Sequence, residues 1–200
     1  PAMMDSFDVL LVDLQDVGCR IYTFITTLRY VLEAAAKHKK AVWVLDRPNP
    51  AGRPVEGTLL QPGWESFVGA GPLPMRHGMT MGELARWFVA TLKIDVDLEV
   101  VPMQGWRRSM LWPETGRTWV APSPNLPRFE GVQVYPGQVL LEGTNLSEGR
   151  GTTKPFEISA SRAETSLRWP NHCSTSWSSR RLAPAHSSST TAMPASTSAA

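Results

Sequence analysis

The residues best equipped for chemistry lie between positions 140 and 157, where the sequence reads LLEGTNLSEGRGTTKPFE. Two leucines lead into carboxylates, an amide, hydroxyls and an arginine, hinged by three glycines. Orienting so many hydrogen-bonding groups costs conformational entropy, and such loops usually carry binding or catalysis. We therefore predict that this segment contacts a polar ligand, through Glu142, Asn145, Glu148 and Arg150.

Two further polar clusters follow apolar runs at residues 8–14 and 41–45, which are typical of strands buried on both faces. In an open α/β sheet, ligands bind beyond the carboxyl ends of the strands. We predict a further strand at residues 139–141, and hence one shared site for all three clusters. The first two clusters comprise Asp13, Gln15, Asp16 and Arg20, and Asp46, Arg47 and Asn49.

The elements between these strands must hold the clusters in place. Apolar spacing predicts a helix over residues 23–39, and therefore a βαβ unit with parallel strands. A second helix should begin near Thr80, because Thr80 and Glu83 have the spacing of a capping box. Residues 53–79 read as an irregular loop and 98–101 as another strand, with Trp43 and Trp87 in the core. This alternation predicts an α/β fold with an open, mostly parallel sheet and flanking helices.

The presence and absence of known motifs indicate which kind of ligand the site binds. No phosphate-binding P-loop, dinucleotide-binding glycine pattern or nucleophile elbow is present. Carboxylates, amides, arginines and interleaved tryptophans suit a carbohydrate, because carboxylate pairs perform glycosidic acid/base catalysis. A Mg²⁺ or Ca²⁺ site built from oxygen ligands is the alternative. Asp13, Asp16, Glu142 and Glu148 could supply those ligands, whereas Arg76, His77 and Asn125 are further candidate contacts for a sugar.

Bulk composition bounds the remaining possibilities. A net charge of +2 argues against nucleic-acid binding, and no apolar run reaches membrane-spanning length. Cys19 and Cys173 read as two free thiols. Residues 161–200 contain 11 Ser and 5 Thr. We predict a domain over residues 1–159 and a disordered tail over 160–200, which is either a linker or the product of a frameshift.

Five ordered motifs carry a family resemblance: VDLQDVGCRIYTF at 12–24, VLDRPNP at 44–50, RHGMTMGELA at 76–85, PSPNLP at 122–127 and LEGTNLSEGRGTT at 141–153. Together they resemble the exo-β-N-acetylmuramidase family (NamZ or YbbC-like), long catalogued as a domain of unknown function. The resemblance implies a Rossmann-like domain followed by a smaller one. It also implies a glycoside hydrolase that needs no cofactor and releases N-acetylmuramic acid from the non-reducing ends of peptidoglycan fragments.

The resemblance suggests roles for the candidate residues. The carboxylate partners would be Glu142, Glu148 and Asp16, with Asp13 able to take the same role. Arg47, Arg76 or Arg150 would pair with the lactyl carboxylate of the sugar. The remaining predicted substrate contacts are Asp13, Gln15, Asn49, His77, Asn125 and Asn145.

Two departures from the family pattern stand out. Family members carry an upstream Gly-Pro-Glu-His-Gly motif, whose glutamate is a candidate catalytic acid, and they continue into the second domain. We therefore expect an internal fragment, incomplete at its N-terminus, inactive alone and with an exposed, aggregation-prone sheet edge. The parent should be a bacterial periplasmic or secreted protein, with the cytoplasm as the alternative. The rival functions are a non-catalytic carbohydrate-binding domain and a metal-dependent phosphoryl or ester hydrolase.

Overall fold

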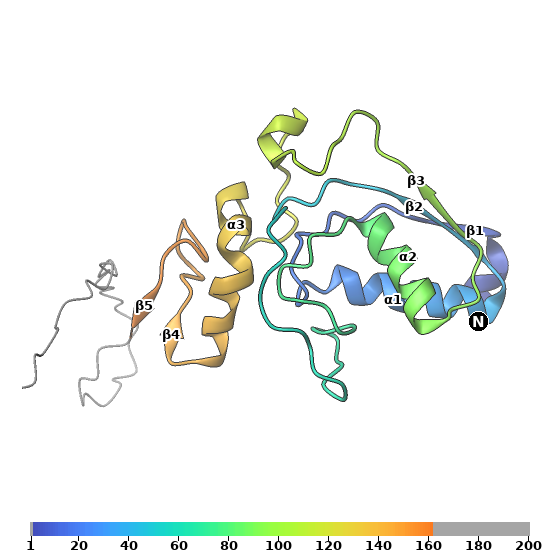
Figure 1. Cartoon of the computed structure of the whole chain (residues 1–200), viewed down its shortest axis with the longest axis horizontal. Coiled ribbons are helices and arrows are strands. Elements are labelled where there is room, and N and C mark those ends of the chain that lie inside the picture. The colour runs from blue at the N-terminus through green and yellow to red at the C-terminus, as the bar shows by residue number, and fades with distance from the viewer. Residues whose placement is uncertain (1, 162–200) are drawn as a thin grey trace, which may run out of the picture.

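A computed structural model describes residues 2–161 of the chain. Three parallel strands form a sheet in the order β1-β2-β3, and the helices that follow β1 and β2 pack against it (Figure 1). The elements, in chain order, are η1 (Ala2–Ser6), β1 (Val9–Val12), α1 (Phe24–His38), β2 (Ala41–Leu45), α2 (Met81–Leu92), β3 (Leu98–Val101), η2 (Trp112–Thr115), α3 (Phe129–Gln138), η3 (Val139–Gly143), β4 (Leu146–Ser147) and β5 (Ala160–Ser161).

The predicted open α/β fold is confirmed, and its βαβ unit forms as expected. β1 and β2 pair in parallel with Leu11 opposite Trp43. The capping box of α2 is present: the Thr80 side chain accepts the Glu83 amide hydrogen, and the Glu83 carboxylate accepts that of Thr80. No helix among the described residues is long and apolar enough to cross a membrane.

Asp46 ties the end of β2 to the start of α2. Its carboxylate accepts the Gly82 amide hydrogen at 2.8 Å and the Thr80 hydroxyl hydrogen at 2.8 Å. A negative charge at a helix N-terminus also interacts favourably with the helix dipole. A methyl group at Gly82 would lie 2.4 Å from Val100 Cγ1, so a glycine is needed for α2 to approach the sheet this closely.

The main core lies between one face of the sheet and the helices α1 and α2. Alternate strand residues point into it, as the two-residue period of a strand requires. The side chains of Ile25, Leu28 and Phe88 on the helices are fully buried there. The strand residues in this core are Val12, Val42, Val44, Leu98 and Val100.

The opposite face of the sheet is open among the described residues, so the prediction that the strands are covered on both faces is wrong here. Leu11 is 57% exposed and Trp43, predicted to be a core residue, is 44% exposed. Both helices pack on the other face. An apolar strand sequence predicts burial on both faces, but it does not show whether any segment packs on the second face. β1 also lies at an edge of the sheet, as expected.

This open face leads to a prediction. Trp43→Thr should change the free energy of unfolding by less than about 0.5 kcal/mol, because Trp43 is already exposed to water in this chain. It should also reduce self-association. The control is Val44→Thr on the buried face of the same strand, where an unpartnered hydroxyl should cost about 1–3 kcal/mol. Urea unfolding and light scattering measure both quantities, and equal destabilisation by the two variants would show that the face is covered.

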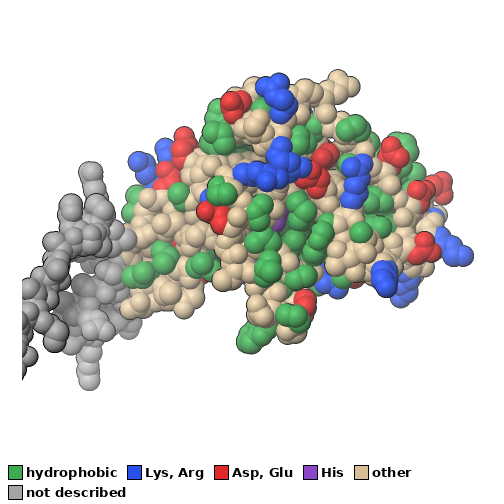
Figure 2. Space-filling view, in the orientation of Figure 1, with side chains coloured by type: hydrophobic (Ala, Val, Ile, Leu, Met, Phe, Trp, Pro, Cys, Tyr) green, Lys and Arg blue, Asp and Glu red, His purple; other side chains and the backbone are tan. Residues whose placement is uncertain are grey.

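A long irregular loop joins β2 to α2, as predicted, and projects away from the helices (Figure 1). Its apolar side chains are largely exposed and appear as hydrophobic surface on this projection in Figure 2. Phe67 stacks on Tyr30 of α1 with ring centroids 6.4 Å apart, whereas Ala70 and Leu73 of the same loop are buried in the main core. The exposed members are Val55, Leu59, Trp64, Phe67 and Val68.

Residues 139–141 do not form the predicted strand. They belong to η3, which continues α3 directly. The three apolar residues are too few to distinguish a strand from a helical turn, and Val139 is buried in a second core beside α3. That core also includes Cys19, whose burial raises its thiol pKa to about 12, so the thiol stays protonated at neutral pH.

The predicted tail falls almost wholly outside the described residues. Its first two residues form β5, which pairs with β4 in antiparallel fashion. The prediction for the remainder, including the free thiol of Cys173, concerns residues 162–200, which the structure does not describe.

Candidate functional site

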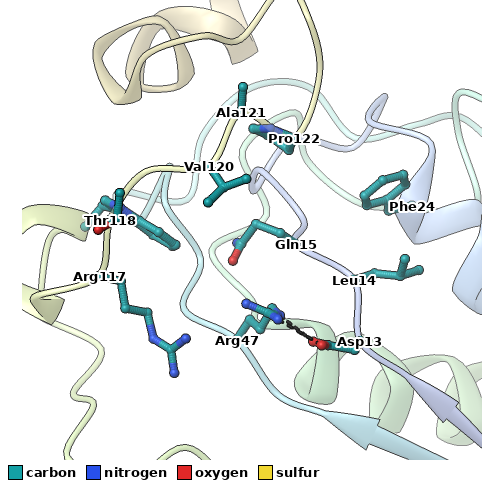
Figure 3. Close-up of a pocket in the computed structure, with 11 residues that line it drawn as sticks. Asp13, Leu14, Gln15, Phe24, Arg47, Arg117, Thr118, Val120, Ala121 and Pro122 are labelled. Atoms are coloured by element: carbon teal, nitrogen blue, oxygen red, sulfur yellow. Dashed lines mark hydrogen bonds and ion pairs between the residues drawn. The ribbon is translucent and has the colours of Figure 1, made fainter.

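A cavity of about 580 Å³ opens at the carboxyl ends of β1 and β2, as the rule for open α/β sheets predicts. Residues that directly follow β1 form one side, and the segment after η2 forms the opposite wall (Figure 3). Its volume lies within the range of about 300–1,000 Å³ typical of small-ligand sites. The lining comprises Asp13, Leu14, Gln15, Phe24, Arg47, Trp112, Arg117, Thr118, Val120, Ala121 and Pro122.

Asp13 and Arg47 bring the first two predicted clusters together. Arg47 Nε donates to Asp13 Oδ1 at 2.5 Å, and a terminal nitrogen of Arg47 donates to Asp13 Oδ2 at 2.9 Å (Figure 3). This bidentate hydrogen bonding from Arg47 holds the pKa of Asp13 below its ordinary value. Asp13 is therefore an ionised carboxylate at neutral pH, suited to accept hydrogen bonds or to stabilise positive charge.

Gln15 completes the strand side of the cavity. Its Nε2 donates to the carbonyl oxygens of Asp16 at 2.8 Å and Pro48 at 3.0 Å, which links the two strand ends. Its Oε1 is buried and has no hydrogen-bond partner among the described residues. A buried acceptor without a partner is costly, so this oxygen is available to a donor on a ligand.

The opposite wall is held by aromatic packing. Trp112 and Trp119 meet edge to face with centroids 5.1 Å apart, and Trp119 Nε1 donates to the Leu126 carbonyl. The Tyr22 hydroxyl, which lies just before α1, donates to the Pro122 carbonyl at 2.8 Å. These contacts fix the backbone on both sides of Arg117, although the Arg117 side chain itself is exposed.

Asp16 and His77 form a buried pair beside the cavity rather than part of its lining. His77 Nε2 lies 3.2 Å from Asp16 Oδ2, and the two side chains are 0% and 4% exposed. His77 Nδ1 accepts the Met79 amide hydrogen at 3.2 Å, so Nε2 carries the ring hydrogen and faces Asp16. Asp16 Oδ2 also accepts the Gly18 amide hydrogen at 2.7 Å. This pair supports the turn after Gln15.

Two other predicted ligand contacts have partners within the protein. Asn49 Nδ2 donates to the Met79 carbonyl at 2.9 Å, and its Oδ1 accepts the Gly52 amide hydrogen at 3.1 Å. Arg76 donates to the Gln133 carbonyl at 2.7 Å and lies 3.1 Å from Glu56. Neither residue lines the cavity. Asn125 is half-buried and does not line it either.

The structure does not bring the third cluster to this cavity. It lies with η3 and β4 on the far side of α3 from the sheet (Figure 1). There Arg150 pairs with the Glu142 carboxylate and with Glu148 Oε1, the latter at 2.8 Å. Asn145 is exposed. Glu142, Glu148 and Arg150 therefore pair with one another at a second location.

Several lining residues escaped the sequence prediction. Trp112, Arg117 and Phe24 sit outside the strand-end clusters, and Phe24 looked like an ordinary helix residue. For Trp112 and Arg117 the sequence did contain a signal of ligand binding, because tryptophans and arginines interleave between residues 106 and 119. No spacing rule places such a loop against a particular strand. Within residues 2–161, no group of three or more His, Cys, Asp or Glu side chains is arranged to hold a metal ion.

The fold and the cavity define an open α/β protein with a small-ligand site at the carboxyl ends of its parallel strands. The chain belongs to the NamZ family. The family model described as "Exo-beta-N-acetylmuramidase NamZ, N-terminal" matches residues 1–130, and its C-terminal counterpart matches residues 133–186. The second match crosses the boundary that composition predicts at residues 159–160, and that boundary stays a prediction.

Known relatives agree with this assignment. The chain is 52% identical over 159 residues to "Peptidoglycan beta-N-acetylmuramidase NamZ" of Bacillus subtilis (strain 168). That alignment covers 79% of this chain and 38% of the relative. Two crystal structures of DUF1343 family proteins from Bacteroides fragilis NCTC 9343 superpose with TM-scores of 0.77 and 0.74 at 38% and 39% identity. They match 81% and 79% of this chain, which spans 43% and 45% of theirs.

Proposed function

We propose that the protein to which this chain belongs is an exo-acting glycoside hydrolase that releases N-acetylmuramic acid from the non-reducing ends of peptidoglycan fragments. Family membership and the Bacillus subtilis relative support this reaction. The observation that carries it in this chain is the cavity at the strand ends, which combines an ionised carboxylate, two arginines and aromatic walls. The site of action we propose is the periplasm or the cell exterior, where peptidoglycan lies.

The cavity offers groups for each part of such a sugar. Phe24 and Trp112 provide apolar surface for a ring face. Gln15 Oε1 can accept a hydrogen bond from a hydroxyl or an amide. Asp13, which bears a negative charge, can stabilise the oxocarbenium-like transition state of glycoside hydrolysis. Arginines pair with carboxylates such as the lactyl group of muramic acid.

One requirement is unmet among the described residues. Glycoside hydrolysis needs a protonated acid at the leaving oxygen, and Asp13, the one carboxylate among residues 2–161 that lines the cavity, is kept ionised by Arg47. We therefore propose that the acid comes from the part of the parent protein upstream of this chain. The chain alone should bind muramyl sugars without cleaving them.

The decisive assay is release of N-acetylmuramic acid from an N-acetylmuramyl-N-acetylglucosamine disaccharide, followed by mass spectrometry. The full-length parent should release the sugar, and the 200-residue chain should not. Binding without release by the parent would contradict hydrolysis and favour a carbohydrate-binding domain. Loss of release on chelation would favour a metal-dependent hydrolase.

A substitution series assigns the carboxylate. Asp13→Asn in the full-length parent should lower kcat by about 10²–10³, the range for loss of one electrostatic contact to a transition state. Asp8→Asn is the matched control, because Asp8 precedes the same strand, is fully exposed and lies at its other end. Glu142→Gln tests the sequence-based choice: a larger loss than that of Asp13→Asn would restore Glu142 as the catalytic partner.

A further inference from the structure

The charges that line the cavity are unbalanced. Among residues 2–161, three charged side chains line it: Asp13, Arg47 and Arg117. Each carboxylate oxygen of Asp13 accepts a hydrogen bond from Arg47, so this pair adds no net charge to the cavity. The Arg117 guanidinium makes no hydrogen bond or ion pair with any residue in the part of the chain that the structure describes. The cavity thus carries a net charge of about +1 at neutral pH.

The backbone at Arg117 is held in place, although its guanidinium has no partner among the described residues. η2 ends immediately before it, with Gly116 in the left-handed conformation at φ 68°, and the Arg117 amide donates to Thr115 Oγ1 at 3.3 Å. Trp119 is packed two residues later. Figure 3 shows Arg117 on the wall opposite the Asp13–Arg47 pair. Arg117 therefore lines the cavity with an exposed side chain, which can contact a group carried by a bound molecule.

The other arginines suggested by the sequence are already paired. Arg76 contacts Glu56 and the Gln133 carbonyl, and Arg150 is held between Glu142 and Glu148 beyond α3. Arg47 is held by Asp13. Of the arginines that could pair with a ligand carboxylate, Arg117 alone combines a place in the cavity wall with a guanidinium free of partners among residues 2–161.

We propose that Arg117 pairs with the carboxylate of the ligand and is the residue that makes this site select acidic N-acetylmuramyl sugars over neutral N-acetylhexosamines. The inference rests on the proposed function for the identity of the sugar. Its physical basis is the match between one unpaired guanidinium and one carboxylate, since arginine binds carboxylates through two parallel hydrogen bonds. N-Acetylglucosamine has the same ring and acetamido group but lacks the acid.

The test uses equilibrium binding, so that it does not depend on turnover. Calorimetric titration of the full-length protein with N-acetylmuramic acid should give a Kd that rises about 10- to 100-fold in Arg117→Gln, as expected for a charge-assisted hydrogen bond. The Kd for the carboxamide of the same sugar, and for N-acetylglucosamine, should be equal in both proteins. Arg107→Gln, in the same segment but outside the cavity lining, should leave every Kd unchanged.

Three results would overturn the inference: an unchanged Kd for the acid in Arg117→Gln, an equal loss for the acid and its carboxamide, or no preference for the acid in the wild type. Arg117→Lys should recover only part of the affinity, because an ammonium group binds without the planar fork. Failure of the parent to cleave the disaccharide would overturn the proposed hydrolase while leaving this binding result intact, so the two failures are distinguishable.

Discussion

Gly18→Ala should destabilise the chain by about 3–5 kcal/mol, combining backbone strain with steric overlap. Gly18 has φ 84°, a conformation that side chains disfavour. A methyl group there would lie 2.1 Å from Asn49 Oδ1 and 2.7 Å from Ala51 Cβ. Asn49 cannot move without cost, because its amide holds the Met79 carbonyl and the Gly52 amide.

The same substitution should also abolish binding at the cavity. Gly18 lies in the turn that continues from Gln15, and its amide is held by the Asp16 carboxylate. Gly116→Ala is the matched control, because Gly116 has φ 68° but no atom within 4 Å of an added methyl group. It should lose only about 1–2 kcal/mol, the cost of the left-handed conformation. Urea unfolding compares the two, and equal losses would show that the overlap with Asn49 is relieved.

Asp16→Ala should destabilise the chain by about 1–3 kcal/mol, the range for leaving a buried hydrogen-bonding group without its partner. It leaves the Gly18 amide without its acceptor in a region shielded from water, and it removes the carboxylate that lies 3.2 Å from His77 Nε2. The control is Glu33→Ala on α1, which breaks an exposed pair with Arg29. An exposed pair of this spacing contributes about 0.3–0.5 kcal/mol.

A second variant, Asp16→Asn, distinguishes a structural role of Asp16 from a catalytic one. The Asp16 side chain is 4% exposed and outside the cavity lining, so its role should be to hold the turn that bears Gln15. In the full-length parent, Asp16→Asn should raise KM more than it lowers kcat per folded molecule, with folding monitored by circular dichroism. A loss of kcat as large as that of Asp13→Asn, without unfolding, would support the sequence-based prediction that Asp16 is catalytic.

The secondary structure was predictable wherever a local signal was complete. The apolar period of α1, the capping box of α2 and the runs that became β2 and β3 each determine their element through neighbours in sequence. Residues 139–141 failed because three apolar residues fit a strand and a helical turn equally well. The predicted location of the third cluster was wrong for the same reason, because it assumed that a strand of the sheet directly precedes Glu142.

The residues of the site were likewise predictable only in part. Asp13, Gln15 and Arg47 were predictable, because residues that follow parallel strands must meet at one edge. The roles of Asp16, Asn49 and Arg76 were not, because a polar residue near a site can face a ligand or brace a loop. Only its hydrogen-bond partners distinguish the two. Arg117 and Trp112 depend on how a long irregular segment folds back across the strand ends, and no local pattern specifies that path.

By itself, the sequence determined the α/β class, the two strand ends that carry chemistry and, through five motifs, the family. Tertiary structure alone decided that the residues from Glu142 to Arg150 lie away from those strand ends. It also decided that, among the described residues, one sheet face is open and the Arg117 side chain lines the cavity without a partner. The physical reason is the distance along the chain over which each kind of interaction acts. Strand, helix and cap signals act over a few residues, whereas burial and charge pairing depend on contacts between segments far apart in the chain.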